Sequence, residues 1–483
     1  MSESQPRHAA PDPSDDEGSS DYVPQRPGGP GQSGLANPKA TRTVWFWTVP
    51  IVITLAVLSA LAAFYLGGIL RPMTNLRHFP IAVVNDDAGP TGGQIVKGLV
   101  SGLDENKYDL RVLSRAEAGH QMDTAQIYGA AVIPPSFSSK LQDFAKSAVT
   151  PGRVDRPVII ISTNPRAGTL GASIAGQTLT RAITMVDRRV GEQLSQEIAE
   201  QTGGAPMASA VTLMLGSPIE IRPTVHNALP DGTGNGLSAF YYSLLLLLAG
   251  FTGSIVVSML VDSMLGYVPA EFGPVYRFAE QVKISRFRTL LIKWALMVAL
   301  ALLTSAVYMA IASELGMPIQ HSWALWLYGV FAILAVGVTS TSLIAVLGSL
   351  GLLVSMFVFV ILGLPSAGAT VPLEATPSFF GWLAKFEPMH QVFLGTRALL
   401  YLDGRPDAGM SQALTLTTVG LVIGLLLGGL IARIYDRRGY HRIPAVPEST
   451  PAAEAPATET PTTAETTNAP QTAVTAEATS ADE

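Results

Sequence analysis

The chain has no cysteine and few charged residues. The absence of cysteine from all 483 residues excludes disulfide bonds, iron–sulfur clusters and thiol catalysis. Charged residues make up 14% of the chain, against about a quarter in a typical soluble domain. No two of the seven histidines have the spacing that would place them on one face of a helix, so the sequence contains no recognisable zinc motif. A net charge of -6 also gives no clustered basic face for nucleic acid.

Charge is missing mainly from six apolar runs, whose lengths suit a hydrocarbon layer of about 30 Å. Lys293 is the one formally charged residue within them. It lies one turn into its run, so we expect its ammonium group to reach the basic edge of the membrane. The sequence predicts a polytopic α-helical membrane protein, in contact with membrane lipid, with six spans: 44–68, 237–261, 289–313, 324–345, 348–364 and 411–432.

Two of these assignments need an argument. The apolar stretch 324–364 is too long for a single crossing at 1.5 Å per residue. Gly348 and Gly351 permit a tight reversal, so we divide the stretch there into two spans. The run 44–68 exceeds the apolar core of a signal peptide, usually about 7–15 residues, and therefore predicts an uncleaved anchor.

The orientation follows from the short loops, since basic loops stay in the cytoplasm. Segments 262–288 and 433–442 each carry four Lys or Arg residues, whereas 314–323 carries none. We therefore expect a multi-pass protein of a bacterial plasma membrane, with both termini cytoplasmic and 69–236 outside.

The two ends of the chain, 1–43 and 441–483, are poor in apolar residues. The first is rich in Pro, Gly and Ser, and the second in Ala, Thr, Pro and acidic residues. Such segments bury too little surface to offset chain entropy, so we predict disordered cytoplasmic tails.

Region 69–236 is long enough for one independent domain. Strand patterns alternate with helical ones, which indicates an α/β domain with at least partly parallel pairing, inserted between spans one and two. Asp86 and Asp87 suit a turn that bonds the local backbone better than a metal site. A glycine-rich hinge, 232–236, leads to the membrane. The predicted strands are 79–84, 108–113, 128–133, 158–162 and 219–225, and the helices 93–103, 116–126 and 168–201.

Motifs that carry chemistry are missing. The sequence has no phosphate-binding loop, His-Glu-x-x-His motif, nucleophile elbow or dinucleotide fingerprint. We therefore expect no enzyme, cofactor or metal site. None of the six runs contains Asp or Glu, although proton-driven pumps commonly use such intramembrane carboxylates. This argues against autonomous proton-coupled transport.

Three segments hold the candidate functional residues. The inner loop 262–288 is basic and amphipathic, and either docks a partner or only fixes the topology. The outer segment 365–410 is too broken for a span and too apolar for a free loop, so we predict a re-entrant or interfacial helix pair, either a lid or a packing cap. Glycines at one-turn spacing in the last span indicate a homodimer seam or packing within one subunit. The residues are Arg277, Lys283, Arg286 and Arg288 for partner coupling, Glu374, Glu387 and Arg397 for an outer gate, and Gly420, Gly424 and Gly428 for helix packing.

Two strings resemble a known family. IAVVNDDAG at 81–89 and GAAVIPPSFSSKL at 129–141 resemble the outer domain of the YhgE/Pip (phage infection protein) family. The stretch 365–397 is similar to the linker before the last span in that family and in type-2 ABC exporter membrane subunits. The layout of one span, a large outer domain and five further spans agrees as well.

The resemblance implies a membrane permease subunit of an ABC-type exporter, and we expect it to form a homodimer. Such a subunit works with a separate ATPase, which would dock on 262–288 and drive movement of a hydrophobic or amphipathic substrate. The alternative is a membrane-anchored receptor, scaffold or secretion accessory protein that acts through its outer domain, because the family includes phage receptors and type VII secretion accessories.

Overall fold

The computed structural model describes residues 43–147, 155–201, 209–277 and 279–440. The predicted disordered tails fall outside these residues, apart from position 43. In the described part of the chain, six helical segments are long and apolar enough to cross a membrane. They confirm the six predicted helices, with ends that differ by about a turn: α1 (Val44–Ile69), α7 (Leu237–Met264), α8 (Arg286–Glu314), α9 (Ser322–Leu347), a broken helix (Ser349–Ser366) and α14 (Met410–Arg437).

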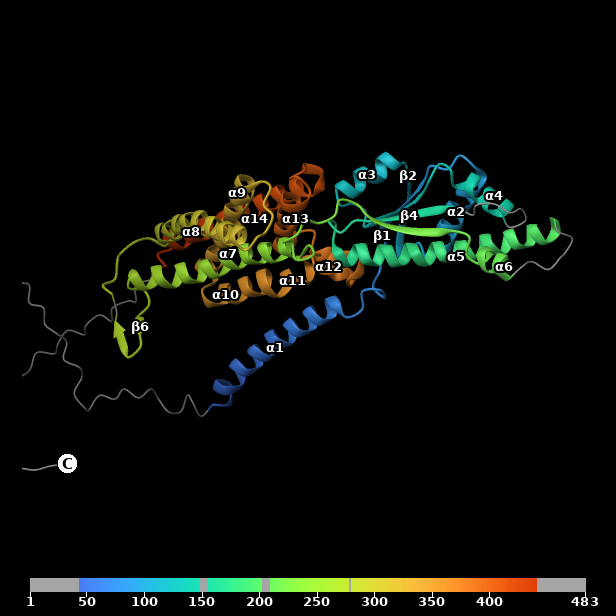
Figure 1. Cartoon of the computed structure of the whole chain (residues 1–483). Helices are drawn as coiled ribbons and strands as arrows, with labels where there is room; N and C mark the ends of the chain where they lie inside the picture. Colours follow the sequence, from blue (N-terminus) through green and yellow to red (C-terminus); the bar gives the residue numbers. More distant parts are fainter. Residues whose placement is uncertain (1–42, 148–154, 202–208, 278, 441–483) are drawn as a thin grey trace, which may run out of the picture.

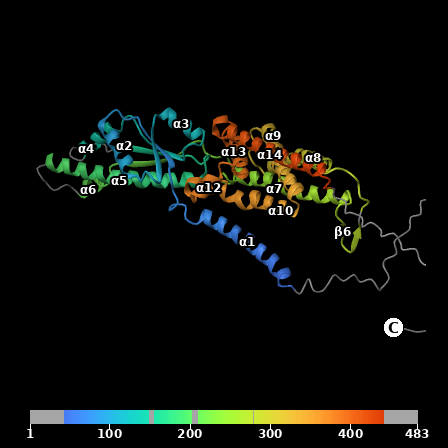
Figure 2. The same cartoon turned by 180° about the vertical axis from the view of Figure 1, so that it is seen from behind.

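The molecule is elongated, with the α/β domain at one end of a helix bundle (Figures 1 and 2). Helices α7, α8, α9 and α14 pack against one another in the bundle. A small hairpin, β6 (Ala270–Phe272) and β7 (Val275–Arg277), projects from the opposite end. Helix α1 touches the broken helix near its own C-terminal end and diverges from the bundle elsewhere.

The predicted reversal at Gly348 is present. Helix α9 ends at Leu347, and Gly348 adopts a φ of 64°, a left-handed value that favours glycine. A side chain at Gly351 would collide with the carbonyl oxygen of Leu343. Glycine at both positions therefore lets the two helices follow each other with almost no loop.

The broken helix consists of three pieces. Helix α10 (Ser349–Met356) passes into the π-helical segment η1 (Phe357–Leu362), which returns to α-helix in α11 (Gly363–Ser366). Segments of π-helix are rare and are frequently found at functional sites.

The α/β domain contains a five-stranded sheet in the order β2-β1-β3-β4-β5 among its described residues. All neighbours pair in parallel except β3 with β4. This confirms the predicted partly parallel sheet. The strands are β1 (Phe79–Asn85), β2 (Tyr108–Leu113), β3 (Gly129–Ile133), β4 (Val158–Thr163) and β5 (Glu220–Val225).

Helices cover the two faces of this sheet unequally. The larger core joins the sheet to α2, α4 and the long helix α5, whereas α3 covers the other face through Ala118 and Met122. Central strands β1 and β3 are therefore buried on both sides, as parallel strands generally are. The helices are α2 (Pro90–Gly102), α3 (Arg115–Asp123), α4 (Phe137–Ser147), α5 (Thr169–Gln201) and α6 (Ser209–Leu215).

The turn after β1 is structural, as predicted. The Asp87 carboxylate accepts hydrogen bonds from the backbone N–H groups of Gly92 and Ser138, at 3.2 and 3.0 Å. Asp86 pairs with Arg115 on α3. Both aspartates thus bond protein groups around the turn.

The segment 365–410 joins the domain to the bundle. It contains the short helices η2 (Leu373–Ala375), α12 (Ser378–Leu383) and η3 (Pro406–Ala408), and the longer α13 (Pro388–Tyr401). Val371 and Ala375 belong to the hydrophobic core of the α/β domain, while α13 lies in the core of the bundle. One segment thus takes part in both cores.

The three glycines of α14 face different surroundings. A Cβ at Gly424 would lie 2.8 Å from Thr339 Cα, and one at Gly428 2.7 Å from Ser342 Cβ, both on α9. A Cβ at Gly420 would meet nothing within 4 Å. Gly424 and Gly428 therefore pack two helices of one subunit closely, and the homodimer stays a prediction.

Gly424→Ala is expected to lower the free energy of unfolding by about 1–3 kcal/mol, because the added methyl group overpacks the α9–α14 contact. Gly420→Ala is the matched control on the same helix, and should be neutral or stabilise by up to about 1 kcal/mol through helix propensity. Denaturant unfolding in one detergent measures both. Equal effects at the two positions would contradict the packing argument.

Candidate functional site

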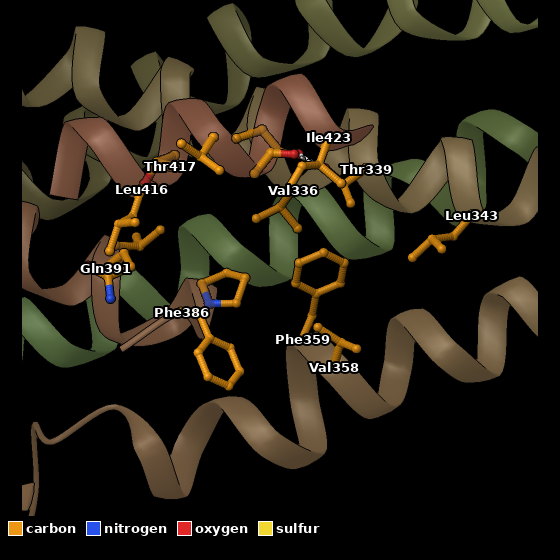
Figure 3. A pocket seen from close by; sticks show the side chains of 15 residues that line it. Val336, Thr339, Leu343, Val358, Phe359, Phe386, Gln391, Leu416, Thr417 and Ile423 are labelled. Atoms are coloured by element: carbon orange, nitrogen blue, oxygen red, sulfur yellow. Dashed lines mark hydrogen bonds between the residues drawn. The ribbon is translucent and has the colours of Figure 1, made fainter. Parts of the chain in front are cut away.

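An apolar cavity of about 260 Å³ lies on the side of the bundle, where the exposed side chains of Val419 and Ile423 form part of its lining (Figure 3). Its walls come from α9, η1, the start of α13, and α14. Figure 3 shows Gln391, Leu416 and Thr417 at one end of the cavity and Leu343 at the other. A space of this kind suits a hydrophobic ligand, oriented by a few polar groups.

The polar groups of this cavity are few and differ in their bonding. Gln391 donates to the Ala384 carbonyl at 2.8 Å and accepts from Gln412 at 3.2 Å. The buried Thr417 hydroxyl lies beside the Tyr328 hydroxyl but makes no hydrogen bond of acceptable geometry among the described residues. A ligand with one hydrogen-bonding group at Thr417 would satisfy that hydroxyl.

A second apolar cavity, of about 350 Å³, lies between α1, α7 and α11. Tyr65 and Leu66 line it from α1, and Leu364 and Pro365 from α11. The first cavity is lined by Val358 of the same broken helix. The broken helix therefore contributes side chains to both cavities.

Glu387 lies at the start of α13 and is only 2% exposed. Its Oε2 accepts the backbone N–H of His390 at 3.0 Å, while Oε1 has no hydrogen-bond partner among the described residues. Burial raises the pKa of Glu387 to about 7, although the N–H groups of Met389 and His390 and the hydroxyl group of Ser366 oppose the shift. The carboxyl group can therefore change its protonation near neutral pH.

The pKa of His390 is shifted in the opposite direction. Its Nδ1 lies 2.8 Å from the Ala367 carbonyl oxygen, which can only accept, so Nδ1 carries the hydrogen. The pKa of His390 is lowered to about 4, mainly by burial and also by the charge of Arg397, while the hydrogen bond to Ala367 opposes the shift. The imidazole is therefore neutral at pH 7.

The other two predicted gate residues meet at the junction with the α/β domain. Tyr128, just before β3, donates to Glu374 Oε2 at 3.2 Å, and Arg397 Nη1 donates to the Ala167 carbonyl at 3.0 Å. Burial raises the pKa of Tyr128 well above its usual value, and the charge of Glu374 adds to the shift. Glu374 and Arg397 thus tie the segment 365–410 to the domain, while Glu387 is held at α13.

A polar pocket of about 110 Å³, which the sequence did not predict, lies at the same junction. The Asp123 carboxylate lies 2.8 Å from His226 Nε2 and accepts from the Asn227 amide at 2.8 Å. Arg166 donates to carbonyl oxygens of Asn227 and Tyr401. The bond from Arg166 to Tyr401 fixes the domain to the end of α13.

The residues predicted for partner coupling are not equivalent. Arg277 lies in β7, and Arg286 and Arg288 in the first turn of α8. Arg286 Nε donates to the Tyr440 carbonyl at 2.6 Å, so this side chain bonds within the chain. Lys283 and Arg288 are exposed and stay available to a partner.

Lys293 differs from the sequence expectation. Its side chain is 1% exposed, and Nζ lies 2.8 Å from Asp262 Oδ1 on α7. Asp262 falls inside α7 because that helix continues to Met264, three residues beyond the predicted span. The predicted path of Lys293 to the membrane edge is therefore wrong, and a candidate span does contain a carboxylate. The argument against proton coupling loses that premise.

Six candidate spans and an α/β region define a multi-pass membrane protein as the class that this fold indicates. Among the described residues, no cluster of three or more His, Cys, Asp or Glu side chains is arranged to hold a metal ion. The chain matches the family described as "Protein of unknown function (DUF3533)" over residues 49–423, and it belongs to that family. No curated protein and no solved structure matches the chain.

Proposed function

We propose that this chain is the membrane permease subunit of an ABC-type exporter, and that it moves a hydrophobic or amphipathic substrate with a separate ATPase. The single observation that carries the proposal is the apolar cavity between α9, η1, α13 and α14. A cavity with apolar walls and one unpartnered hydroxyl suits an amphipathic molecule better than an ion or a sugar.

The end of the bundle opposite the α/β domain has features that suit a partner protein. The β6–β7 hairpin projects from the bundle there, followed by exposed Lys283 and Arg288. Asp436 of α14 accepts hydrogen bonds from the N–H groups of Arg286 and Phe287 at the start of α8. A partner on this loop would therefore act on α8 and α14 together.

Gly420→Trp is expected to abolish export, because position 420 lines the cavity and has space for a Cβ. The control, Val422→Trp, places the same bulk two residues along α14 at an exposed position. The readout is ATP-dependent efflux of the fluorescent apolar amine N-phenyl-1-naphthylamine from cells expressing the chain. Loss in both variants, or in neither, would contradict a role for this cavity.

The partner is tested by co-purification of an ATPase with the full chain. Combined Lys283→Gln and Arg288→Gln should reduce the recovered ATPase activity, whereas Lys97→Gln with Lys140→Gln, two exposed lysines of the α/β domain, should not. If no ATPase is recovered and Gly420→Trp leaves the cellular phenotype intact, the receptor or scaffold alternative is favoured.

A further inference from the structure

We propose that the Glu387 carboxyl is a proton-binding site whose charge decides whether the first turn of α13 stays packed on Gly363 of the broken helix. This goes beyond export driven by an ATPase, because the ligand is a proton and Glu387 does not itself line the cavity of Figure 3.

The contact itself is close and depends on glycine. A Cβ at Gly363 would lie 3.1 Å from Glu387 Oε1 and 3.2 Å from Met389 Cβ. Gly363 is the residue at which η1 returns to α-helix. The missing side chain thus admits the carboxyl group to the point where the helix is broken.

The surroundings hold no charge to balance a carboxylate. The facing segment, Phe357–Ser366, has no ionisable side chain. On the other packed elements, His390 is neutral, Lys385 at the end of α12 is exposed, and Tyr65 of α1 donates to the Val360 carbonyl at 3.1 Å. Arg397 lies further along α13, where it bonds Ala167. A charge on Glu387 is therefore unpaired.

The two protonation states of Glu387 require different numbers of hydrogen-bond donors. A carboxylate offers about four acceptor sites, and a buried charge without enough hydrogen bonds is costly. Glu387 Oε1 has none among the described residues, so the buried geometry suits the protonated form. The titration of Glu387 near neutral pH agrees with this.

Loss of the proton calls for a hydrogen-bond donor at Oε1, which water would supply if α13 separated from Gly363. The neighbours of the contact line the two apolar cavities, Pro388 the first and Leu364 the second. Deprotonation would thus open a connection between the cavities.

Infrared difference spectra of the purified full chain, about pH 5.5 minus about pH 8.5, test the site directly. We expect a C=O stretch of a buried protonated carboxyl group in the unmodified chain, its loss in Glu387→Gln, and its retention in Glu374→Gln. A chain without this band, or a band that survives Glu387→Gln, would overturn the proposal. Neither result depends on an ATPase, so failure here is distinct from failure of the export function.

A second measurement tests the movement. Because the chain has no cysteine, Leu364→Cys introduces a single thiol on the lining of the second cavity. Its alkylation rate with a neutral maleimide should rise with pH more steeply when Glu387 is present than in Glu387→Gln, which serves as the control for ionisation of the thiol itself. We expect the rate with Glu387, divided by the rate in Glu387→Gln, to increase about tenfold between about pH 5.5 and 8.5, as the deprotonated fraction of Glu387 grows. An unchanged ratio would show that the contact does not open.

Discussion

Asp262→Ala is expected to lower the free energy of unfolding by about 3–5 kcal/mol, one of the largest effects of any single substitution in this chain. The substitution removes the carboxylate that lies 2.8 Å from Lys293 Nζ and leaves a cation that is 1% exposed among apolar helices. Removing one partner of a buried ion pair is costly, because the remaining charge stays desolvated after the close attraction to its partner is lost.

A double variant separates the lost attraction from the cost of the remaining charge. Asp262→Leu with Lys293→Met replaces both partners by apolar side chains of similar size, and should recover most of the stability, since buried ion pairs often gain little over apolar packing. Asp104→Ala, at an exposed turn of the α/β domain, is the control for loss of an aspartate. Unfolding in the same detergent measures all three.

Recovery in the double variant would raise the question of what the ion pair does. It joins α7 to α8 next to the loop that carries the β6–β7 hairpin. We expect the double variant to fold but to lose the response to a partner bound at Lys283 and Arg288. If Asp262→Ala were as stable as the unmodified chain, the pair would not be buried as the structure shows.

Most of the fold could be predicted from the sequence because it depends on local pattern. The alternation in 108–113 matches β2 residue for residue, and the buried run 79–84 matches β1 to within one residue. The division of 324–364 at Gly348 was predictable because a left-handed turn there has a clear glycine signal. The side of the membrane on which the domain lies depends on the loop charges and stays a prediction.

What could not be predicted depends on contacts between distant segments. Hydropathy places Asp262 just outside a span, and only the relative rotation of α7 and α8 brings it to Lys293. Glu387 lies in a stretch that is largely apolar, and no local signal shows that the first turn of α13 packs on Gly363. Likewise, Val371 joins the core of a domain that ends far earlier in the chain.

Glu387→Gln and His390→Asn are expected to change the dependence of stability on pH with opposite slopes, although the two groups together contribute no slope in the unmodified chain between pH 4.5 and 6.5. The pKa of Glu387 is raised from 4.5 to about 7, so its contribution to stability is complete below pH 4.5 and is lost as the pH rises through about 7. The pKa of His390 is lowered from 6.5 to about 4, so its contribution is complete above pH 6.5 and is lost as the pH falls through about 4.

The two effects cancel in the unmodified chain. Between pH 4.5 and 6.5 the folded pair holds one proton, on Glu387, and the unfolded pair also holds one, on His390. Because stability changes with pH only when the two states bind different numbers of protons, this pair gives no slope there. Each shift alone corresponds to about 3 kcal/mol.

Removing one of the two groups makes the pH dependence caused by the other measurable. In Glu387→Gln the remaining histidine should make stability increase from about pH 4 to 6.5, and in His390→Asn the remaining glutamate should make it decrease from about pH 4.5 to 7. Asparagine keeps a donor for the Ala367 carbonyl, so the second variant retains that hydrogen bond.

At pH 8, the free energy of unfolding of Glu387→Gln should exceed that of the unmodified chain by up to about 3 kcal/mol, since the variant no longer buries a carboxylate. Denaturant unfolding across this range measures the slopes. Parallel profiles in the three proteins would show that the two groups titrate as they do in water, and the proton site at the start of α13 would lose its physical basis.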